Sequence, residues 1–128
     1  MKPKNETPDQ VTAEVIGLFN ESFRVHDISI LNKIVAENCV METAMPAPIG
    51  VTTIGRKDCL AFWKKMIDAT ETQFSPEEIT VMGEKAIIIW RYRWGDGNDK
   101  FVKGCTIVTV KNGLITEVVA YIKGTLGS

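Results

Sequence analysis

The pair His26-Asp27 is the first candidate for proton transfer in this chain. His26 is its only histidine. An imidazole exchanges a proton near neutral pH, and a neighbouring carboxylate can orient the ring. Residues adjacent in sequence rarely face each other, and this pair falls at an expected turn between two helices. The pattern therefore favours a structural role.

The cysteines and acidic residues lack the spacing of a metal site. Cys39, Cys59 and Cys105 are odd in number and widely separated, and neither a CxxC pair nor a His/Cys cluster occurs. The segment 95–99 contains Asp-Gly-Asn-Asp but lacks the ligand spacing and final glutamate of a calcium loop, so we expect a turn there. The sequence predicts no metal, no cofactor, and buried free cysteines in a reducing compartment.

Composition predicts one globular domain over residues 1–128, with 1–6 and 125–128 as flexible tails. The chain is 45% apolar and 24% charged, and its net charge is −1. A balanced charge without a basic run argues against a nucleic-acid partner. The polar N-terminus does not resemble a signal peptide, and no apolar run is long enough to span a bilayer. We therefore expect a cytoplasmic protein without a membrane partner.

Three helices are expected in the N-terminal half. Thr7-Pro8-Asp9-Gln10 has the pattern of a capping box with proline at the first helical position. Apolar residues then recur at three- and four-residue spacing as far as Phe23. A short second helix is predicted to carry Ile30 to Val35, and a third runs from about Arg56 to Ala69.

Strands are expected at residues 39–45, 73–82, 86–94, 101–110 and 114–122. Pro76 cannot donate to a sheet ladder, so its strand should lie on an edge. Asn112-Gly113 is a strong hairpin signal, because a type I′ turn needs positive φ at both central residues. Helices gathered on one face of a curved antiparallel sheet make an α+β domain.

Both faces of the last three strands are apolar, so both need a cover. A sheet with one wet face alternates between apolar and polar residues, whereas Ile87 and Ile89 are apolar on the face opposite Ile88 and Trp90. The helices can cover one face, and we expect a second copy of the chain to cover the other. The predicted homodimer interface comprises Ile87, Ile89, Arg91, Arg93, Cys105, Ile107, Val119 and Tyr121.

The order of these elements resembles the nuclear transport factor 2-like superfamily, in its SnoaL-like and ketosteroid isomerase-like branch. The resemblance is carried by residues 27–31 and 36–40, by Met45-Pro46 followed by Gly55-Arg56, and by residues 104–121. It implies a cone-shaped curved antiparallel sheet with three helices on its concave face. It also implies association of two copies through the outer face.

The resemblance places uncharged residues at the positions of the known acids and bases. In ketosteroid isomerases a tyrosine, an aspartate base and a protonated aspartate do the chemistry. Their positions fall here at Phe19, at Thr43 or Met45, and at Thr106. The resemblance therefore leaves open whether this chain is an enzyme.

The related limonene epoxide hydrolases use a carboxylate–arginine–carboxylate set with a tyrosine and an asparagine. Those positions fall at Tyr92, Trp90 and Ala120, with Met41 and Thr43 for the last two. Again the carboxylates are missing. The catalytic residues are thus unknown.

Tyr92 and Glu42 remain the weak candidates for a chemical role. Glu42 should point out of the cavity by strand alternation. A bulge near Thr43 would turn it inward and supply a base.

The residues expected to face inward form a mostly apolar wall suited to a flat, hydrophobic small molecule. They are Phe19, Phe23, Thr43, Met45, Phe62, Met66, Trp90, Tyr92, Thr106, Val108, Val118, Ala120 and Ile122. The leading hypothesis is a dimer that binds such a ligand, and it includes a diverged isomerase-, cyclase- or hydrolase-like enzyme. The alternative is a non-catalytic dimerisation or interaction module whose side chains fill the cavity.

Overall fold

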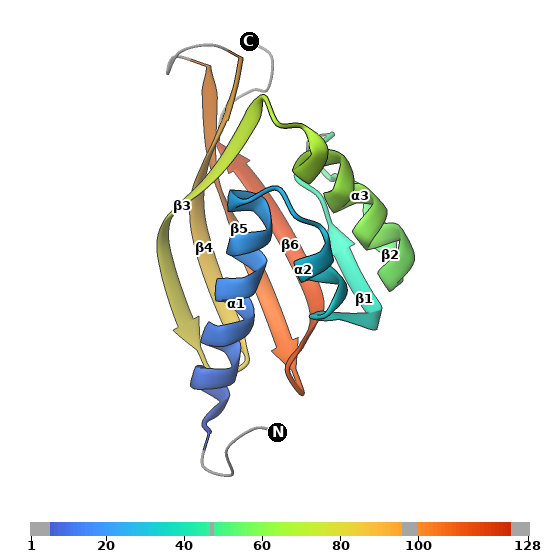
Figure 1. Cartoon of the computed structure of the whole chain (residues 1–128), viewed down its shortest axis with the longest axis vertical. Coiled ribbons are helices and arrows are strands. Elements are labelled where there is room, and N and C mark those ends of the chain that lie inside the picture. The colour runs from blue at the N-terminus through green and yellow to red at the C-terminus, as the bar shows by residue number, and fades with distance from the viewer. Residues whose placement is uncertain (1–5, 47, 96–99, 124–128) are drawn as a thin grey trace.

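Three helices and six strands make up the described part of the chain, residues 6–46, 48–95 and 100–123, in this computed structural model (Figure 1). The helices are α1 (Pro8–Arg24), α2 (Ser29–Asn32) and α3 (Arg56–Asp68). The strands are β1 (Val35–Glu42), β2 (Thr52–Ile54), β3 (Thr72–Met82), β4 (Lys85–Trp94), β5 (Phe101–Lys111) and β6 (Leu114–Lys123). The expected turn at 95–99 and the expected tails lie almost wholly outside the described residues.

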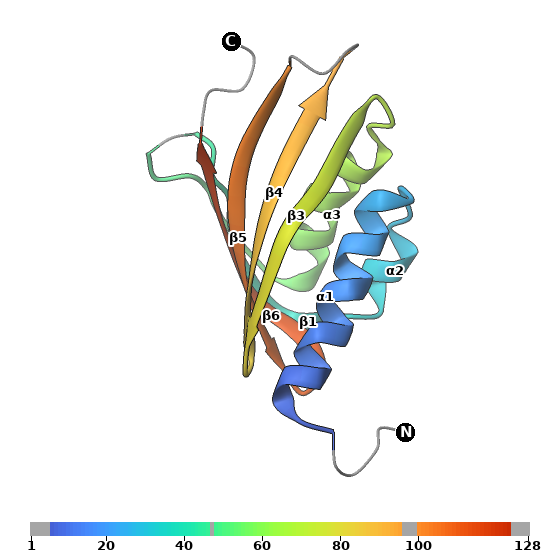
Figure 2. The same ribbon diagram turned by 90° about the vertical axis from the view of Figure 1, so that its left-hand side faces the viewer.

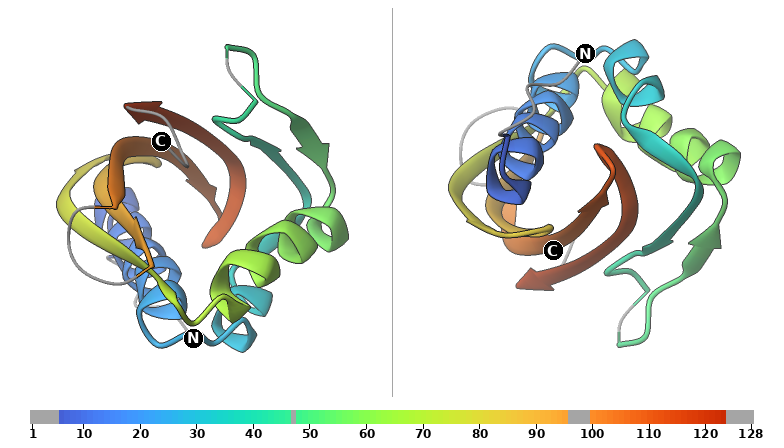
Figure 3. Two further views of the ribbon diagram at one scale, coloured as in Figure 1. Left: turned by 90° about the horizontal axis from the view of Figure 1, so that it is seen from above. Right: turned by 90° about the horizontal axis from the view of Figure 1, so that it is seen from below.

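The strands form one curved sheet, and all three helices lie on its concave side (Figure 2). The strand order is β2-β1-β6-β5-β4-β3. The views along the long axis show that the sheet bends around the helices without closing (Figure 3). The α+β fold is confirmed, and the sheet is mixed because β1 runs parallel to β6 while the other neighbours are antiparallel.

Helix α1 begins with the predicted capping box. The Thr7 hydroxyl accepts from the backbone N–H of Gln10, and the Gln10 side chain accepts from the N–H of Thr7. The carboxylate of Asp9 also accepts from the N–H of Gly83, at 2.7 Å, in the turn between β3 and β4. These contacts fix the start of α1 to the sheet, so that its apolar stripe faces the concave side.

The second helix and the first strand have different bounds from those predicted. Helix α2 ends at Asn32, and the carbonyl of Ile34 accepts from the N–H of Ile115 on β6 at 2.7 Å. This pairing draws Val35 into β1, four residues earlier than expected. Strand β2, which is three residues long, was not predicted.

Two turn predictions are confirmed. Asn112 and Gly113 have φ of 53° and 78° and join β5 to β6 directly, as a type I′ turn requires. Pro76 lies on β3, an edge strand, beside a register irregularity that ends at Glu78.

Among the described helices, none combines the length and apolar character needed to cross a bilayer.

Candidate functional site

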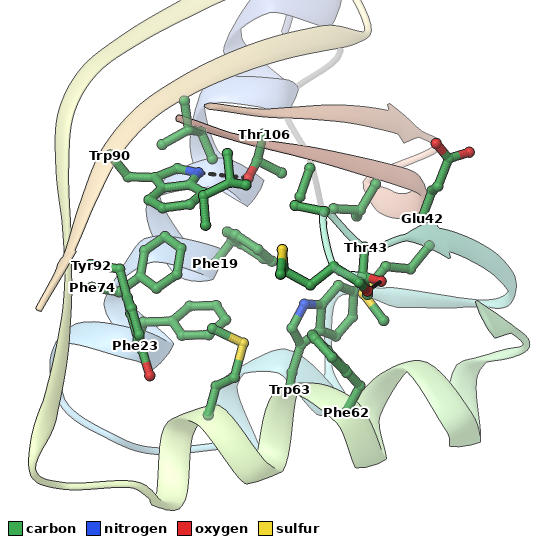
Figure 4. Close-up of a pocket in the computed structure, with 18 of the residues that line it drawn as sticks. Phe19, Phe23, Glu42, Thr43, Phe62, Trp63, Phe74, Trp90, Tyr92 and Thr106 are labelled. Atoms are coloured by element: carbon green, nitrogen blue, oxygen red, sulfur yellow. Dashed lines mark hydrogen bonds between the residues drawn. The ribbon is translucent and has the colours of Figure 1, made fainter. Parts of the chain in front are cut away.

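A cavity of about 340 Å³ lies between the concave face of the sheet and the helices α1 and α3 (Figure 4). It is lined by Phe19, Asn20, Phe23, Met41, Glu42, Thr43, Ala44, Met45, Phe62, Trp63, Met66, Phe74, Ile88, Trp90, Tyr92, Val102, Thr106, Val118, Ala120 and Ile122. The volume falls in the range of about 300–1,000 Å³ found for small-molecule pockets. The described side chains therefore leave a space of ligand size.

Every residue expected on the pocket wall lines this cavity except Val108. Val108 points toward the same face but is fully buried between Ala86 and Val118, its partners on β4 and β6. It therefore belongs to the solid core beneath the cavity. Strand alternation correctly predicted the face of the sheet on which Val108 lies, but it could not predict that the side chain is buried beneath the cavity surface.

Several lining residues were not among the predicted ones. Phe74 faces the cavity from β3 beside its register partner Tyr92, which only the β3–β4 pairing reveals. Met41 lies two residues before Thr43 and shares its face. Trp63 lines the cavity from α3; the apolar spacing of that helix places it on the buried side, although it was not predicted for the pocket wall. Asn20 lines the cavity from α1, and no motif in the sequence singled it out.

Aromatic rings form one wall of the cavity. The Phe74 ring lies 4.5 Å from the ring of Trp90 and 5.6 Å from that of Tyr92, measured between ring centroids. Phe23 continues the row at 5.4 Å from Phe74. The rings are tilted by 40–57° to one another, at separations within the range of about 4.5–7 Å in which aromatic pairs attract each other. The wall is consequently rigid, apolar and suited to a flat ligand.

A buried hydrogen bond at the cavity wall joins two strands. Trp90 Nε1 donates to Thr106 Oγ1 at 2.8 Å, and both side chains are buried. The Thr106 hydroxyl thereby uses an acceptor position and keeps its own proton, for which no acceptor is found among the described residues. A donor is thus available at the cavity wall.

The Thr43 hydroxyl holds the loop that follows β1. Its oxygen accepts from the N–H of Val51 at 3.0 Å and donates to the carbonyl of Met45 at 2.8 Å. Gly50 passes so near that an added Cβ would lie 1.8 Å from the Thr43 carbonyl oxygen. The bond between Met45 and Pro46 is cis. Thr43 therefore shapes the cavity mouth.

The two weak catalytic candidates occupy different places. Glu42 is exposed at the end of β1, and its carboxylate points away from the cavity centre (Figure 4). The irregular register of β1 lies between Val35 and Val40, ahead of Glu42, and does not turn it inward. Tyr92 is half-buried and lines the aromatic wall.

His26 and Asp27 do not form a pair. His26 Nδ1 lies 2.7 Å from the carbonyl oxygen of Ile67, near the end of α3. Asp27 accepts from the hydroxyl of Ser29 at 2.7 Å and from its N–H at 3.0 Å, and these bonds lower the pKa of the carboxyl group. Neither residue lines the cavity, and both connect the helices.

All three cysteines are free. Burial raises the pKa of the Cys39 thiol to about 12, and it also raises the pKa of Cys59. Cys105 is half-buried on the outer face. Within the described ranges, no group of three or more His, Cys, Asp or Glu side chains is placed to hold a metal ion.

The outer face of the sheet carries an ionic cluster beside its apolar centre. Glu77 lies 2.9 Å from Lys103 Nζ and 3.2 Å from Arg91 Nε, although the latter nitrogen has no properly directed hydrogen bond. The Arg91 guanidinium also lies 4.3 Å above the ring of Phe101. The hydrogen bond from Lys103 is the main cause that lowers the pKa of Glu77.

The residues predicted for the dimer interface all lie on this outer face, and the apolar ones are only partly covered. Ile87, Ile89, Cys105, Ile107 and Val119 are half-buried, and Tyr121 is 55% exposed.

Comparison with known proteins places this geometry in a family. The SnoaL-like domain matches residues 16–118. An NTF2-like protein of unknown function from Mesorhizobium loti is 37% identical, with a TM-score of 0.86 over 96% of this chain and 98% of the other. Among curated proteins, no match is found.

Two more distant structures share the fold. A proposed ketosteroid isomerase from Kribbella flavida is 16% identical, with a TM-score of 0.79 over 95% of this chain and 84% of that one. A proposed polyketide cyclase from Sinorhizobium meliloti is 20% identical, with a TM-score of 0.69 over 84% of this chain and 93% of the other. Since the matched domain spans most of the sequence, the chain belongs to the SnoaL-like family of the NTF2-like superfamily.

Proposed function

We propose that the cavity binds a small, uncharged, hydrophobic molecule. The observation that carries this proposal is a space of about 340 Å³ whose interior wall is aromatic and aliphatic, with isolated hydrogen-bonding groups. A cavity of this kind between a sheet and helices would lower stability if it had no occupant, because its lining loses packing contacts.

The charge of the lining supports an uncharged ligand. Glu42 is the one ionisable carboxylate among the lining residues, and it lies exposed at the rim. No lysine, arginine or histidine of the described chain lines the cavity to offset an anion. Burying an unpaired ionic group in such a wall is costly. Charged molecules should therefore bind poorly.

Hydrogen bonding, rather than proton transfer, is the chemistry that the interior supports. Thr106 can donate its hydroxyl proton, and its bond from Trp90 polarises that hydroxyl. A threonine hydroxyl stays protonated at neutral pH and is a poor general base. The names of the isomerase and cyclase neighbours make a related ligand class reasonable, and we propose binding as the function of this chain.

A matched pair of fluorescent probes tests the proposal. N-phenyl-1-naphthylamine is neutral, and its 8-sulfonate has the same ring system with a fixed negative charge. The neutral probe should bind with enhanced fluorescence and the sulfonate should bind at least about tenfold more weakly, a difference of about 1.4 kcal/mol.

A cavity-filling variant controls for surface binding of the probe. Ala120→Phe places a ring in the cavity and should abolish the fluorescence enhancement, whereas Thr80→Phe adds the same ring at an exposed position of β3. Equal binding of the neutral probe by wild type and Ala120→Phe, or equal binding of the two probes by wild type, contradicts the proposal.

We also propose that two copies associate through the outer face of the sheet. The support is the half-buried apolar centre formed by Ile87, Ile89, Ile107 and Val119, which covers three adjacent strands. Monomeric proteins rarely leave such a continuous apolar patch in water. A two-fold arrangement covers both patches at once.

A further inference from the structure

Trp63 carries a donor that the fold leaves without an acceptor. The residue lies on α3 and is only 3% exposed. No hydrogen bond of its indole nitrogen is found among the described residues, and this nitrogen is not one of their fully buried side-chain atoms that lack a partner, so accessible space adjoins it. Figure 4 shows the nitrogen on the side of the ring that faces the cavity. The small exposed part of Trp63 belongs to the cavity surface, since the residue lines it.

The ring of Trp63 is held in place by its neighbours. Phe19 meets it edge to face, with 5.8 Å between ring centroids and an interplanar angle of 85°. The start of α3 is tied to β1, because Arg56 Nε donates to the carbonyl of Val35 at 3.2 Å. Trp63 is thus a fixed part of the core, and its N–H is directed into the cavity.

The cavity lining offers this N–H few acceptors. Phe62 and Met66 line the cavity from α3, and Met41 and Met45 line it from β1 and its loop. The lining residues with side-chain oxygen atoms form no hydrogen bond with Trp63; they are Asn20, Glu42, Thr43, Tyr92 and Thr106. Thioether sulfur is a weak acceptor, and a phenyl ring offers only its face. A donor cut off from water without a partner is unfavourable, so this N–H is satisfied by water that enters the cavity or by a ligand atom.

We propose that Trp63 determines ligand specificity by donating its indole N–H to an oxygen atom of the bound molecule. The inference rests on the proposed binding function and adds a requirement to it. Thr106 presents its hydroxyl from β5, and Trp63 presents its N–H from α3, across the cavity (Figure 4). The ligand class that matches both donors is an uncharged apolar molecule with hydrogen-bond-accepting oxygens on two of its edges.

The preference for oxygen follows from what each ligand displaces. An acceptor oxygen replaces the water that satisfies the N–H in the empty cavity, whereas a hydrocarbon removes that water and leaves the donor unpaired. A neutral hydrogen bond of this kind has a net value equivalent to a roughly three- to tenfold difference in affinity.

Two probes of nearly equal size isolate the contribution of the Trp63 hydrogen bond to the affinity. 1-Acetonaphthone carries a carbonyl oxygen where 1-ethylnaphthalene carries hydrogens, and each can be titrated as a competitor of N-phenyl-1-naphthylamine. Wild type should bind the ketone roughly three- to tenfold more tightly than the hydrocarbon. Trp63→Phe should keep the hydrocarbon affinity and lose most of that preference, while the control Trp94→Phe, outside the cavity lining, should keep both.

Nuclear magnetic resonance on the wild-type protein gives a second test, which does not require that any variant folds. The chain has three tryptophans and so three indole N–H signals. The Trp63 signal should shift downfield with the ketone and much less with the hydrocarbon. An unmoved Trp63 signal, or a Trp63→Phe protein that retains the preference, overturns this inference. Failure of both probes to bind wild type instead overturns the proposed binding function.

Discussion

Trp90 and Thr106 form a buried hydrogen bond of 2.8 Å between adjacent strands, β4 and β5, on the concave face of the sheet. Trp90 pairs with Gly104 in the register, and a Cβ on Gly104 would lie 2.5 Å from the indole ring. The absence of a side chain at Gly104 lets the ring lie across β5 and reach Thr106. One small residue therefore sets the shape of the cavity floor.

Removing the acceptor of this bond should destabilise the protein. Thr106→Val keeps the shape of the side chain but leaves the Trp90 N–H buried without a partner, at a cost of about 1–3 kcal/mol. Thr106→Ser keeps the hydroxyl and should retain more of the stability. Urea unfolding followed by tryptophan fluorescence measures both. A Thr106→Val protein at least as stable as Thr106→Ser would show that the hydrogen bond contributes little.

Two glycines should respond to alanine in opposite ways. Gly17 lies exposed within α1 with no atom near an added Cβ, so Gly17→Ala should raise the free energy of unfolding by about 0.5–1 kcal/mol. Gly50 has φ of 77°, and its Cβ would collide with the Thr43 carbonyl. Gly50→Ala should lower stability, because positive φ alone costs about 1–2 kcal/mol for a residue with a Cβ.

Thermal unfolding of the two glycine variants beside wild type gives the comparison. The neutral probe should also bind less tightly to Gly50→Ala, since the loop after β1 contributes Met45 to the cavity. Unchanged stability of Gly50→Ala would mean that this loop has room to rearrange.

The faces of β4 and β5 could be predicted from the sequence because side chains alternate along a strand. Trp90, Tyr92 and Thr106 were placed on the concave face by that rule, and the structure has them there. Alternation fixes a direction only while the register is regular. At Val35 the parallel pairing with β6 begins, and it depends on a contact with Ile115, which lies near the other end of the chain.

The helical part of the cavity was less predictable for a geometric reason. The apolar side of α3 is broad and includes Phe62, Trp63, Met66 and Ile67, so the sequence does not fix the rotation of the helix. The structure turns Ile67 into the core and leaves Phe62 37% exposed at the mouth. Packing against β1, rather than the pattern itself, decides which ring faces the cavity.

Stability at low pH should depend on Glu77. The hydrogen bond from Lys103 lowers its pKa below the ordinary value of 4.5, so the unfolded chain binds this proton more readily than the folded one. The stabilisation is present above pH 4.5 and is lost as the pH falls from there through the lower, folded-state pKa. Glu77→Gln should therefore flatten the decline in stability below pH 4.5.

Urea unfolding at several pH values measures that decline. Glu78→Gln is the matched control, since Glu78 is an exposed neighbour on β3 that forms none of the described ion pairs. The effect should be small and should shrink in high salt, because the pair is partly exposed to solvent. If the free energy of unfolding depends on pH in the same way for Glu77→Gln and wild type at low salt, Glu77 does not cause the loss of stability below pH 4.5.

If two copies associate through the outer face, the mass of the protein in solution should be that of a dimer. Wild type should sediment at twice the chain mass of 14.2 kDa, and Ile107→Glu should sediment as a monomer. Ile107 lies on β5 between Ile87 and Val119, so a carboxylate there would be buried unpaired at the centre of the interface. Leu18→Glu, at a position of α1 that is 44% exposed on the helical side, should leave the mass unchanged. A wild-type monomer at high protein concentration, or an Ile107→Glu dimer, would exclude this face as the contact between two copies. If Ile107→Glu is a monomer that still binds the neutral probe normally, the outer face serves association and the cavity serves binding independently.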